Sequence, residues 1–64
     1  MHRGDQIRAE AEIEEAARRA ASALRLLDEA QRLAEPHRSD RIRLARLDLS
    51  ALQGCHRRAV AVLA

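Results

Sequence analysis

Pro36 is the only proline of the chain, and it constrains the fold more than any other residue. On both sides of it stand long stretches rich in Ala, Leu, Glu and Arg, which are strong helix formers. Proline has no N–H for a helical hydrogen bond and disfavours helical geometry in the residue before it, so a helix must end there. The sequence therefore predicts an all-α chain, with one helix over about residues 5–35 and a second over about residues 40–63.

The connection between these helices, residues 36–40, is short, and short connections join antiparallel neighbours. We expect Ser39 to cap the second helix, because a serine hydroxyl accepts hydrogen bonds from the free N–H groups of a first turn. Gly54 either kinks the second helix or ends it. The prediction is one domain over residues 1–64, an antiparallel helical hairpin. Its residues 1–10 either fray or lie against another subunit, because the second helix is too short to reach them.

The apolar residues are too small for the core of an enzyme. The 64 residues include 14 Ala but only nine Leu, three Ile and two Val, and there is no Phe, Tyr or Trp. Such a chain builds no large water-excluding pocket and has no aromatic platform on which single-stranded nucleic acid could stack. Cys55 and His56 are adjacent on a helix and diverge too far to chelate a metal. We therefore expect no enzyme, no cofactor and no metal site.

A single cysteine also forms no internal disulfide, so a chain this short needs another source of stability. The spacing of its apolar residues indicates contacts between helices as that source. One stripe follows the first helix: Ile13, Ala17, Ala20, Leu24, Leu27 and Ala34. The second helix carries two stripes about a third of a turn apart: Ile42, Ala45, Leu49, Leu52, His56, Ala59 and Leu63, then Leu44, Leu47, Ala51, Cys55 and Val62. One neighbouring helix covers only about 100° of a helix surface, so the second helix must contact at least two others.

The simplest source of a further helix is a second copy of the chain, and a two-fold dimer of hairpins closes as a four-helix bundle. We predict a partner interface of large or small apolar residues: Ala20, Leu24, Leu27, Leu44, Leu47, Leu49, Leu52, Cys55 and Leu63. The expected function is non-enzymatic protein–protein interaction or oligomerisation. The partner is first the chain itself, most simply as a homodimer, and then a larger helical protein.

Three arginines suggest an alternative function. Arg43, Arg46 and Arg57 project from one side of the second helix, with no acidic residue on that strip, and arginines in a row can follow the phosphate backbone of RNA or DNA. The net charge of only +2 favours an ordinary solvated face instead. A small dimeric nucleic-acid-binding protein is therefore the second hypothesis.

The compartment follows from what the sequence contains. Its longest apolar run, residues 59–64, is far below the about 20 residues of a membrane span. No secretory signal pattern opens the chain, and one cysteine fits a reducing compartment. Apart from histidine every basic residue is Arg, which is typical of GC-rich bacterial coding. We expect a bacterial, cytoplasmic protein with no membrane partner.

Residues 23–30, ALRLLDEA, with the later pair Glu35-Pro36, resemble the second helix of a tetratricopeptide repeat, which has small residues, a large apolar residue and a closing proline at that spacing. Residues 47–52, Gly54 and residues 59–63 are similar to the first helix, turn and second helix of a following repeat. The resemblance implies a peptide-binding or scaffolding surface. The helix–turn–helix layout is also similar to small dimeric hairpin proteins, such as the plasmid RNA-organising hairpin protein and the small co-chaperones of type III secretion needle subunits.

Overall fold

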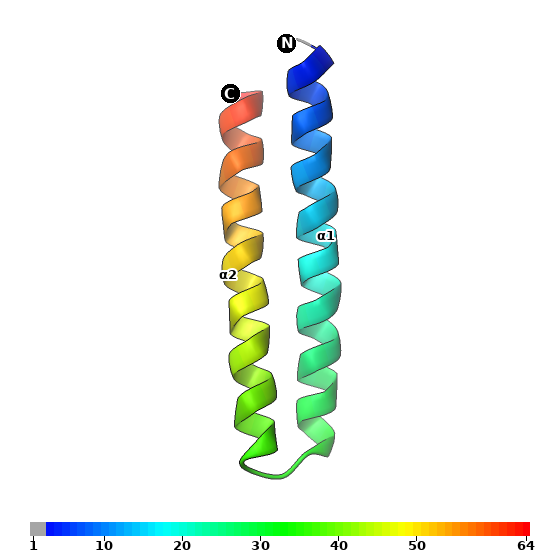
Figure 1. Cartoon of the computed structure of the whole chain (residues 1–64), viewed down its shortest axis with the longest axis vertical. Helices are drawn as coiled ribbons and strands as arrows, with labels where there is room; N and C mark the ends of the chain where they lie inside the picture. The colour runs from blue at the N-terminus through cyan, green and yellow to red at the C-terminus, as the bar shows by residue number, and fades with distance from the viewer. Residues whose placement is uncertain (1–2) are drawn as a thin grey trace.

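The computed structural model describes residues 3–64, and these residues form two long antiparallel helices and no strand (Figure 1). Helix α1 spans Arg3–Arg32 and helix α2 spans His37–Leu63. The predicted all-α helical hairpin is thus confirmed for these residues. The Cα atoms fill a rod of 50 × 13 × 10 Å, with the turn at one end and both termini at the other.

The turn lies earlier than predicted. It occupies residues 33–36, whereas the sequence placed it at residues 36–40. Arg38 helps to end α1, because its Nε donates to the carbonyl oxygens of Ala30 at 3.3 Å and of Leu33 at 2.9 Å. Ala30 lies in the last turn of α1 and Leu33 directly follows the helix, so neither carbonyl has the full set of partners that a continuing helix would give it.

Pro36 precedes the first residue of α2, with φ −87° and ψ −2°. A proline ring fixes φ near the helical value, and the N–H that proline lacks would have no helical partner at this end anyway. The prediction that Ser39 caps α2 was therefore wrong. Ser39 lies in the first turn of α2, and its hydroxyl hydrogen-bonds to the Glu35 carboxylate.

Alanines spaced seven residues apart form the contact line between the two helices, here called the alanine seam. Ala9 and Ala23 of α1 are each 2% exposed, and Ala45 of α2 is 1% exposed. The remaining buried or half-buried apolar members are Ala16, Leu26 and Ala30 of α1, Leu33 of the turn, and Leu52, Cys55, Ala59 and Val62 of α2. Small side chains let the two backbones approach closely, so the inside of the hairpin is filled mostly by methyl groups.

The stripe predicted for the first helix does not lie against α2. Ile13 is 55% exposed, Leu24 is 68% exposed, and Ala17 is exposed as well. The seam is instead a line displaced around α1, and it includes the charged residues Glu12 and Arg19. Both charges have partners on α2, described below, so the helices meet along the line that has the smallest side chains rather than along the purely apolar one.

Helix α2 runs through Gly54 without interruption, so this glycine does not end it. The turn that the tetratricopeptide resemblance implies at Gly54 is therefore not formed. At the other end of the molecule, α1 is already helical at Arg3, and the burial of Ala9 shows that α2 covers α1 at least that far. Of the segment 1–10 that was expected to fray or to contact another subunit, residues 1 and 2 lie outside the described residues.

Candidate association surface

Ion pairs between the helices show which residues lie level with each other. Glu12 of α1 accepts a hydrogen bond from Arg58 of α2, with 3.0 Å between Oε2 and Nε. Nearer the turn, Glu29 accepts from Arg41 at 3.0 Å. Each pair joins two residues that are equally far from the turn along their helices. This register extends along the whole hairpin, because both helices rise by the same 1.5 Å per residue.

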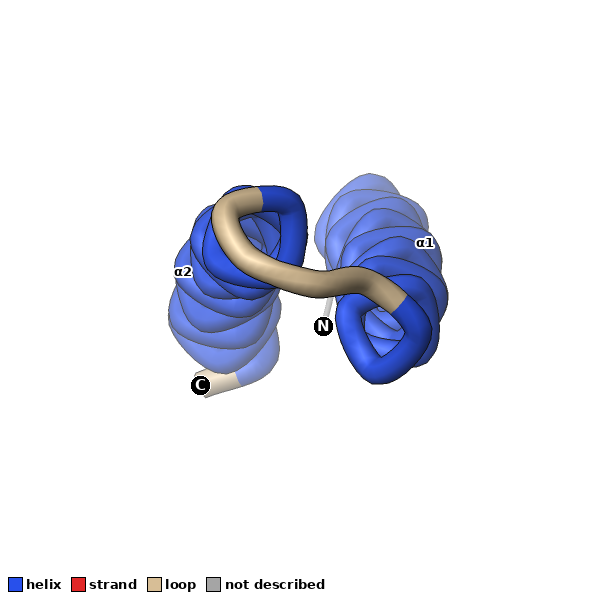
Figure 2. The backbone as a smooth tube through the Cα atoms, turned by 90° about the horizontal axis from the view of Figure 1, so that it is seen from below, coloured by secondary structure: helices blue, strands red, loops and turns tan. Residues whose placement is uncertain are grey.

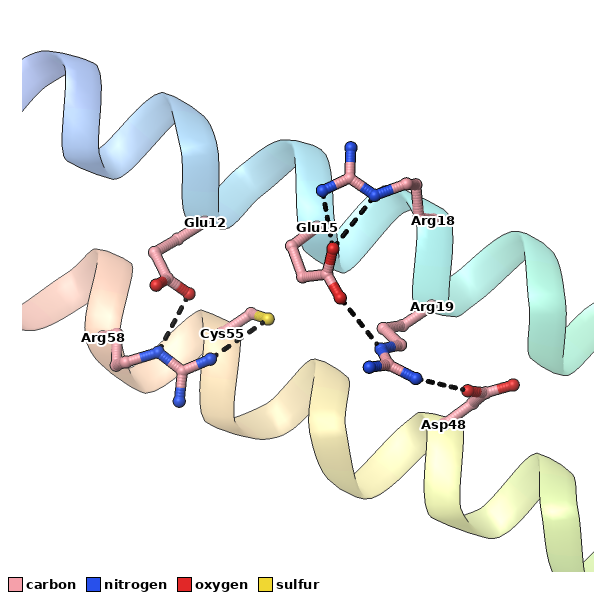
Figure 3. A network of polar contacts seen from close by, with 7 residues as sticks. All are labelled: Glu12, Glu15, Arg18, Arg19, Asp48, Cys55 and Arg58. Atoms are coloured by element: carbon pink, nitrogen blue, oxygen red, sulfur yellow. Dashed lines mark hydrogen bonds and ion pairs between the residues drawn. The ribbon is translucent and has the colours of Figure 1, made fainter.

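Five of the seven ion pairs of the described residues gather on one long side of the hairpin, here called the charged flank, with Glu15, Arg18, Arg19, Glu29, Arg41 and Arg58. Figure 3 shows its central network, in which Glu15 accepts from Arg18 at 2.6 Å and from Arg19 at 3.0 Å. Arg19 continues across the seam to Asp48, with 3.2 Å between Nη1 and Oδ1. Glu15, Arg19 and Arg58 also border one shallow hollow, which confirms that they share a side.

Hydrogen bonding holds three carboxylates of this network in their charged forms. The Arg58 guanidinium lowers the pKa of Glu12, and the Arg18 guanidinium lowers that of Glu15. Hydrogen bonding from the Ser22 hydroxyl, and then from Arg19, lowers the pKa of Asp48. Asp48 is only 8% exposed, so it is a charged residue inside the alanine seam. A pair of this kind fixes register, because any slip of the helices leaves its charge without a partner.

The opposite long side carries the apolar side chains, and we call it the apolar flank: Ile13, Ala17, Ala20, Leu24, Leu27, Ile42, Leu49, Val60 and Leu63. Ile13, Ala20 and Leu27 follow one another at seven residues and therefore share one side of α1. Leu27 also borders a hollow together with Ile42 of α2, which places both helices' apolar rows on the same side. Seen from the turn, the two helices form a single layer, and no other described element covers this flank (Figure 2).

The apolar flank is built in four levels, each with one residue from each helix at equal distance from the turn. From the turn outward these levels are Leu27 with Ile42, Ala20 with Leu49, Ile13 with His56, and Gln6 with Leu63. Four of their apolar members are at least 39% exposed: Ile13, Leu27, Leu49 and Leu63. The hollow between Leu27 and Ile42, which Ala30, Gln31 and Arg38 also line, has a volume of about 470 Å³.

The structure separates the predicted interface residues into three groups. Five belong to the apolar flank: Ala20, Leu24, Leu27, Leu49 and Leu63. Leu44 and Leu47 stay exposed but lie on the side of α2 that faces the charged flank, since Leu47 borders the same hollow as Glu15. Leu52 and Cys55 belong to the alanine seam. Cys55 is 2% exposed, so a partner cannot touch it without opening the hairpin.

The arginines of the nucleic-acid hypothesis lie on the outer side of α2. Arg43, Arg46 and Arg57 are all exposed. The prediction that no acid lies on this strip was wrong, because Asp40 sits one turn before Arg43 and pairs with it, with 2.6 Å between Oδ1 and Nη2. Cys55 points into the seam while His56 is exposed on the apolar flank, and in residues 3–64 no three His, Cys, Asp or Glu side chains gather as metal ligands would.

The predicted stripes contained the α2 members of the seam but divided them, with Ala45, Leu52 and Ala59 in one stripe and Cys55 in the other. The signal for a single line was present as alternating steps of three and four residues through Ala45, Asp48, Leu52, Cys55 and Ala59. Asp48 interrupted the apolar pattern, so the seam residues were grouped with leucines of the outer rows. Asp48 has an opposite charge, Arg19, near the matching level of the other helix, and this pairing indicates that the line through Asp48 faces the other helix.

Comparisons with protein-family models, curated proteins and solved structures found no significant match to this chain. Neither described helix has an apolar stretch long enough to cross a bilayer.

Proposed function

We propose that this chain is a non-enzymatic association module that pairs with a second copy of itself through the apolar flank, forming a four-helix bundle. The observation that carries the proposal is the division of apolar residues between the inside and the outside of the hairpin. The buried apolar residues are five alanines and Cys55, whereas nine large aliphatic side chains are at least 39% exposed.

Free energy favours covering those exposed side chains. Burying one methyl group contributes about 0.8 kcal/mol, whereas fully burying a leucine or isoleucine contributes about 1.5–3 kcal/mol. The alanine seam therefore realises only a small part of the hydrophobic free energy that the sequence contains. Pairing through the apolar flank would bury Ile13, Leu27, Leu49 and Leu63 from each of two chains at once.

The flank has the size of a stable interface. Its Cα footprint, 50 Å long and 13 Å wide, is about 650 Å² before side chains are counted. Stable pairs of proteins bury about 800 Å² on each partner. A second copy matches this footprint in length and width. Glu10 and Arg46 stand on the outer margins of the flank, so a partner hairpin can cover the apolar rows without burying them. Arg38 borders the hollow beside Leu27, and its Nε is already hydrogen-bonded to backbone carbonyls there.

Two exposed leucines give a matched test. Leu24 lies on the apolar flank and is 68% exposed, while Leu47 lies off it and is 62% exposed. Leu24→Glu places a carboxylate at the margin of the pairing surface, and we expect it to weaken dimerisation at least tenfold, the equivalent of about 1.4 kcal/mol. Leu47→Glu should leave the dimer intact. Sedimentation equilibrium of both variants measures the difference.

Equal behaviour of the two variants would contradict the proposal, whether both dissociate or both remain paired. Circular dichroism supplies the folding control, because both positions are on helix surfaces and should keep their helicity when paired. A larger helical protein stays the second kind of partner, and pairing with it would use the same flank. We place the module in the cytoplasm, where its unpaired cysteine would stay reduced.

Nucleic-acid binding is the alternative, and its observation is the exposure of Arg43, Arg46 and Arg57 along one helix. If it holds, replacing Arg46 and Arg57 by Ala should reduce the salt dependence of duplex RNA or DNA binding by about two units in log–log slope. If the chain binds neither duplex RNA nor duplex DNA at low salt, the nucleic-acid alternative is wrong. The Arg43–Asp40 pair weakens this alternative, because one of the three cations already has a counter-ion.

A further inference from the structure

The two ends of the apolar flank differ in shape. At the turn end, Leu27 and Ile42 border the hollow of about 470 Å³, whose lining is mostly apolar. At the other end Leu63 is 48% exposed and stands on the same side of α2 as Ile42. These two residues are 21 positions apart, so the hollow and the exposed leucine are separated by about 32 Å along the helix.

Two two-fold arrangements can bring one apolar flank against another. In the first, the symmetry axis runs along the hairpin and both turns lie at the same end of the bundle. In the second, the axis crosses the hairpin at mid-length and the turns lie at opposite ends. Every adjacent pair of helices is antiparallel in both, so helix dipoles do not choose between them.

Turns at the same end would set each level of the flank against its own copy. The hollow beside Leu27 would then face an identical hollow, which leaves a void where a protein interior is normally packed. The two copies of His56 would share one level, which would put two polar imidazoles in the same layer of the core. The two copies of Gln6 would share another level.

Turns at opposite ends exchange the levels. Leu63 of the second copy then reaches the hollow between Leu27 and Ile42, together with Gln6 of its own level, and the symmetry repeats this contact at the other end. Ile13 and His56 of the second copy lie at the level of Ala20 and Leu49, where the small alanine leaves room for a larger side chain. An exposed leucine thus faces a hollow, and larger side chains face an alanine, as close packing between helices requires.

We propose, resting on the self-association proposed above, that two hairpins pair with their turns at opposite ends, with Leu63 of each filling the hollow beside Leu27 of the other. The arrangement distributes the polar residues Gln6 and His56 over separate levels. Because the axis is two-fold, the contact occurs twice, and the hollow of each chain accepts Leu63 of the other.

The distance between the two turns tests this directly. A nitroxide spin label on His37→Cys, in a Cys55→Ala background, marks the exposed start of α2 in each copy. Pulsed electron paramagnetic resonance should give a distance of roughly 50 Å, the length of the rod. Turns at the same end would give under about 25 Å, because neighbouring helices in a bundle are 8–10 Å apart. If Cys55→Ala alters the mass of the assembly, the label is used with Cys55 retained, since its thiol is buried.

The outcomes separate the two proposals. A dimer with the short distance overturns the pairing direction and leaves self-association standing, whereas a labelled chain and a parent that both stay monomeric overturn self-association itself. As a second readout, Leu63→Ala should weaken dimerisation on the order of a hundredfold, because the lost contact occurs twice. Leu47→Ala is the matched control off the flank, and an equal effect of both variants contradicts the contact at the hollow.

Discussion

Enlarging one alanine of the seam tests whether the helices meet where the structure places them. Ala23 is 2% exposed between α1 and α2, so Ala23→Leu inserts three carbon atoms where there is no room. Overpacking of this kind costs about 1–3 kcal/mol. Leucine is nearly as good a helix former as alanine, so little of the cost comes from helix propensity. For a chain of this size 1 kcal/mol moves the melting temperature by about 4–8 °C, so a cost of about 2 kcal/mol lowers it by roughly 8–16 °C.

The assay is thermal unfolding followed by circular dichroism at one fixed protein concentration, because association makes Tm depend on concentration. Ala21→Leu is the matched control. Ala21 lies two residues away on the exposed side of α1, and the same substitution there should change stability by less than about 0.5 kcal/mol. If Ala23→Leu melts with the parent while Ala21→Leu is destabilised, the helices do not meet along the alanine seam.

Three further predictions concern the helices and their ion pairs. Gly54→Ala should raise Tm by about 4–8 °C in a circular dichroism melt, since alanine gains about 1 kcal/mol in a helix interior and the added Cβ meets only the flexible end of Arg58 at 3.3 Å; a lower Tm would mean that α2 bends there. The pKa of Asp48 is lowered in the folded chain, so the stability that its charged form contributes is present above its ordinary pKa and is lost as the pH falls through the lowered pKa. At pH values below about 4 the urea midpoint of unfolding should therefore decrease, and it should decrease less in Asp48→Asn. An equal decrease in both proteins would mean that the carboxylate is unpaired in solution. Glu12→Arg alone should lower the urea midpoint of unfolding, and the double variant Glu12→Arg with Arg58→Glu should restore it, because the ion pair is then reversed. If the double variant does not recover the midpoint, these two residues are not paired across the helices.

The hairpin itself could be predicted because its signals are local. Helix-forming residues on both sides of Pro36 dictate two helices, and a short connection dictates that they run antiparallel. The position of the turn was missed by about four residues because side chains beyond the proline contribute to it. Arg38 reaches back to the carbonyls of Ala30 and Leu33, and this contact forms only after the chain has turned, so the sequence alone does not reveal it.

The inner face of the hairpin was not predictable from apolar spacing, because its determinants are pairwise. A charged side chain at a helix contact is unfavourable alone, but Asp48 and Arg19 neutralise each other when both are present. The pattern of one helix by itself therefore does not show that these residues lie in the alanine seam. The leucine rows that dominate the sequence pattern became the outer apolar flank instead. Leu24 and Leu49, which were expected at an interface, are therefore exposed in a single chain, whereas Cys55 is buried between the two helices.

The central claim is that folding of this chain is completed by a second copy. The mass measured by sedimentation equilibrium over a concentration series, with helicity recorded at each point, tests it most directly. Self-association predicts twice the 7.2 kDa chain mass at high concentration, and a loss of helicity that accompanies dissociation on dilution. A compact species of 7.2 kDa at every concentration, with a cooperative and concentration-independent melt, would contradict it.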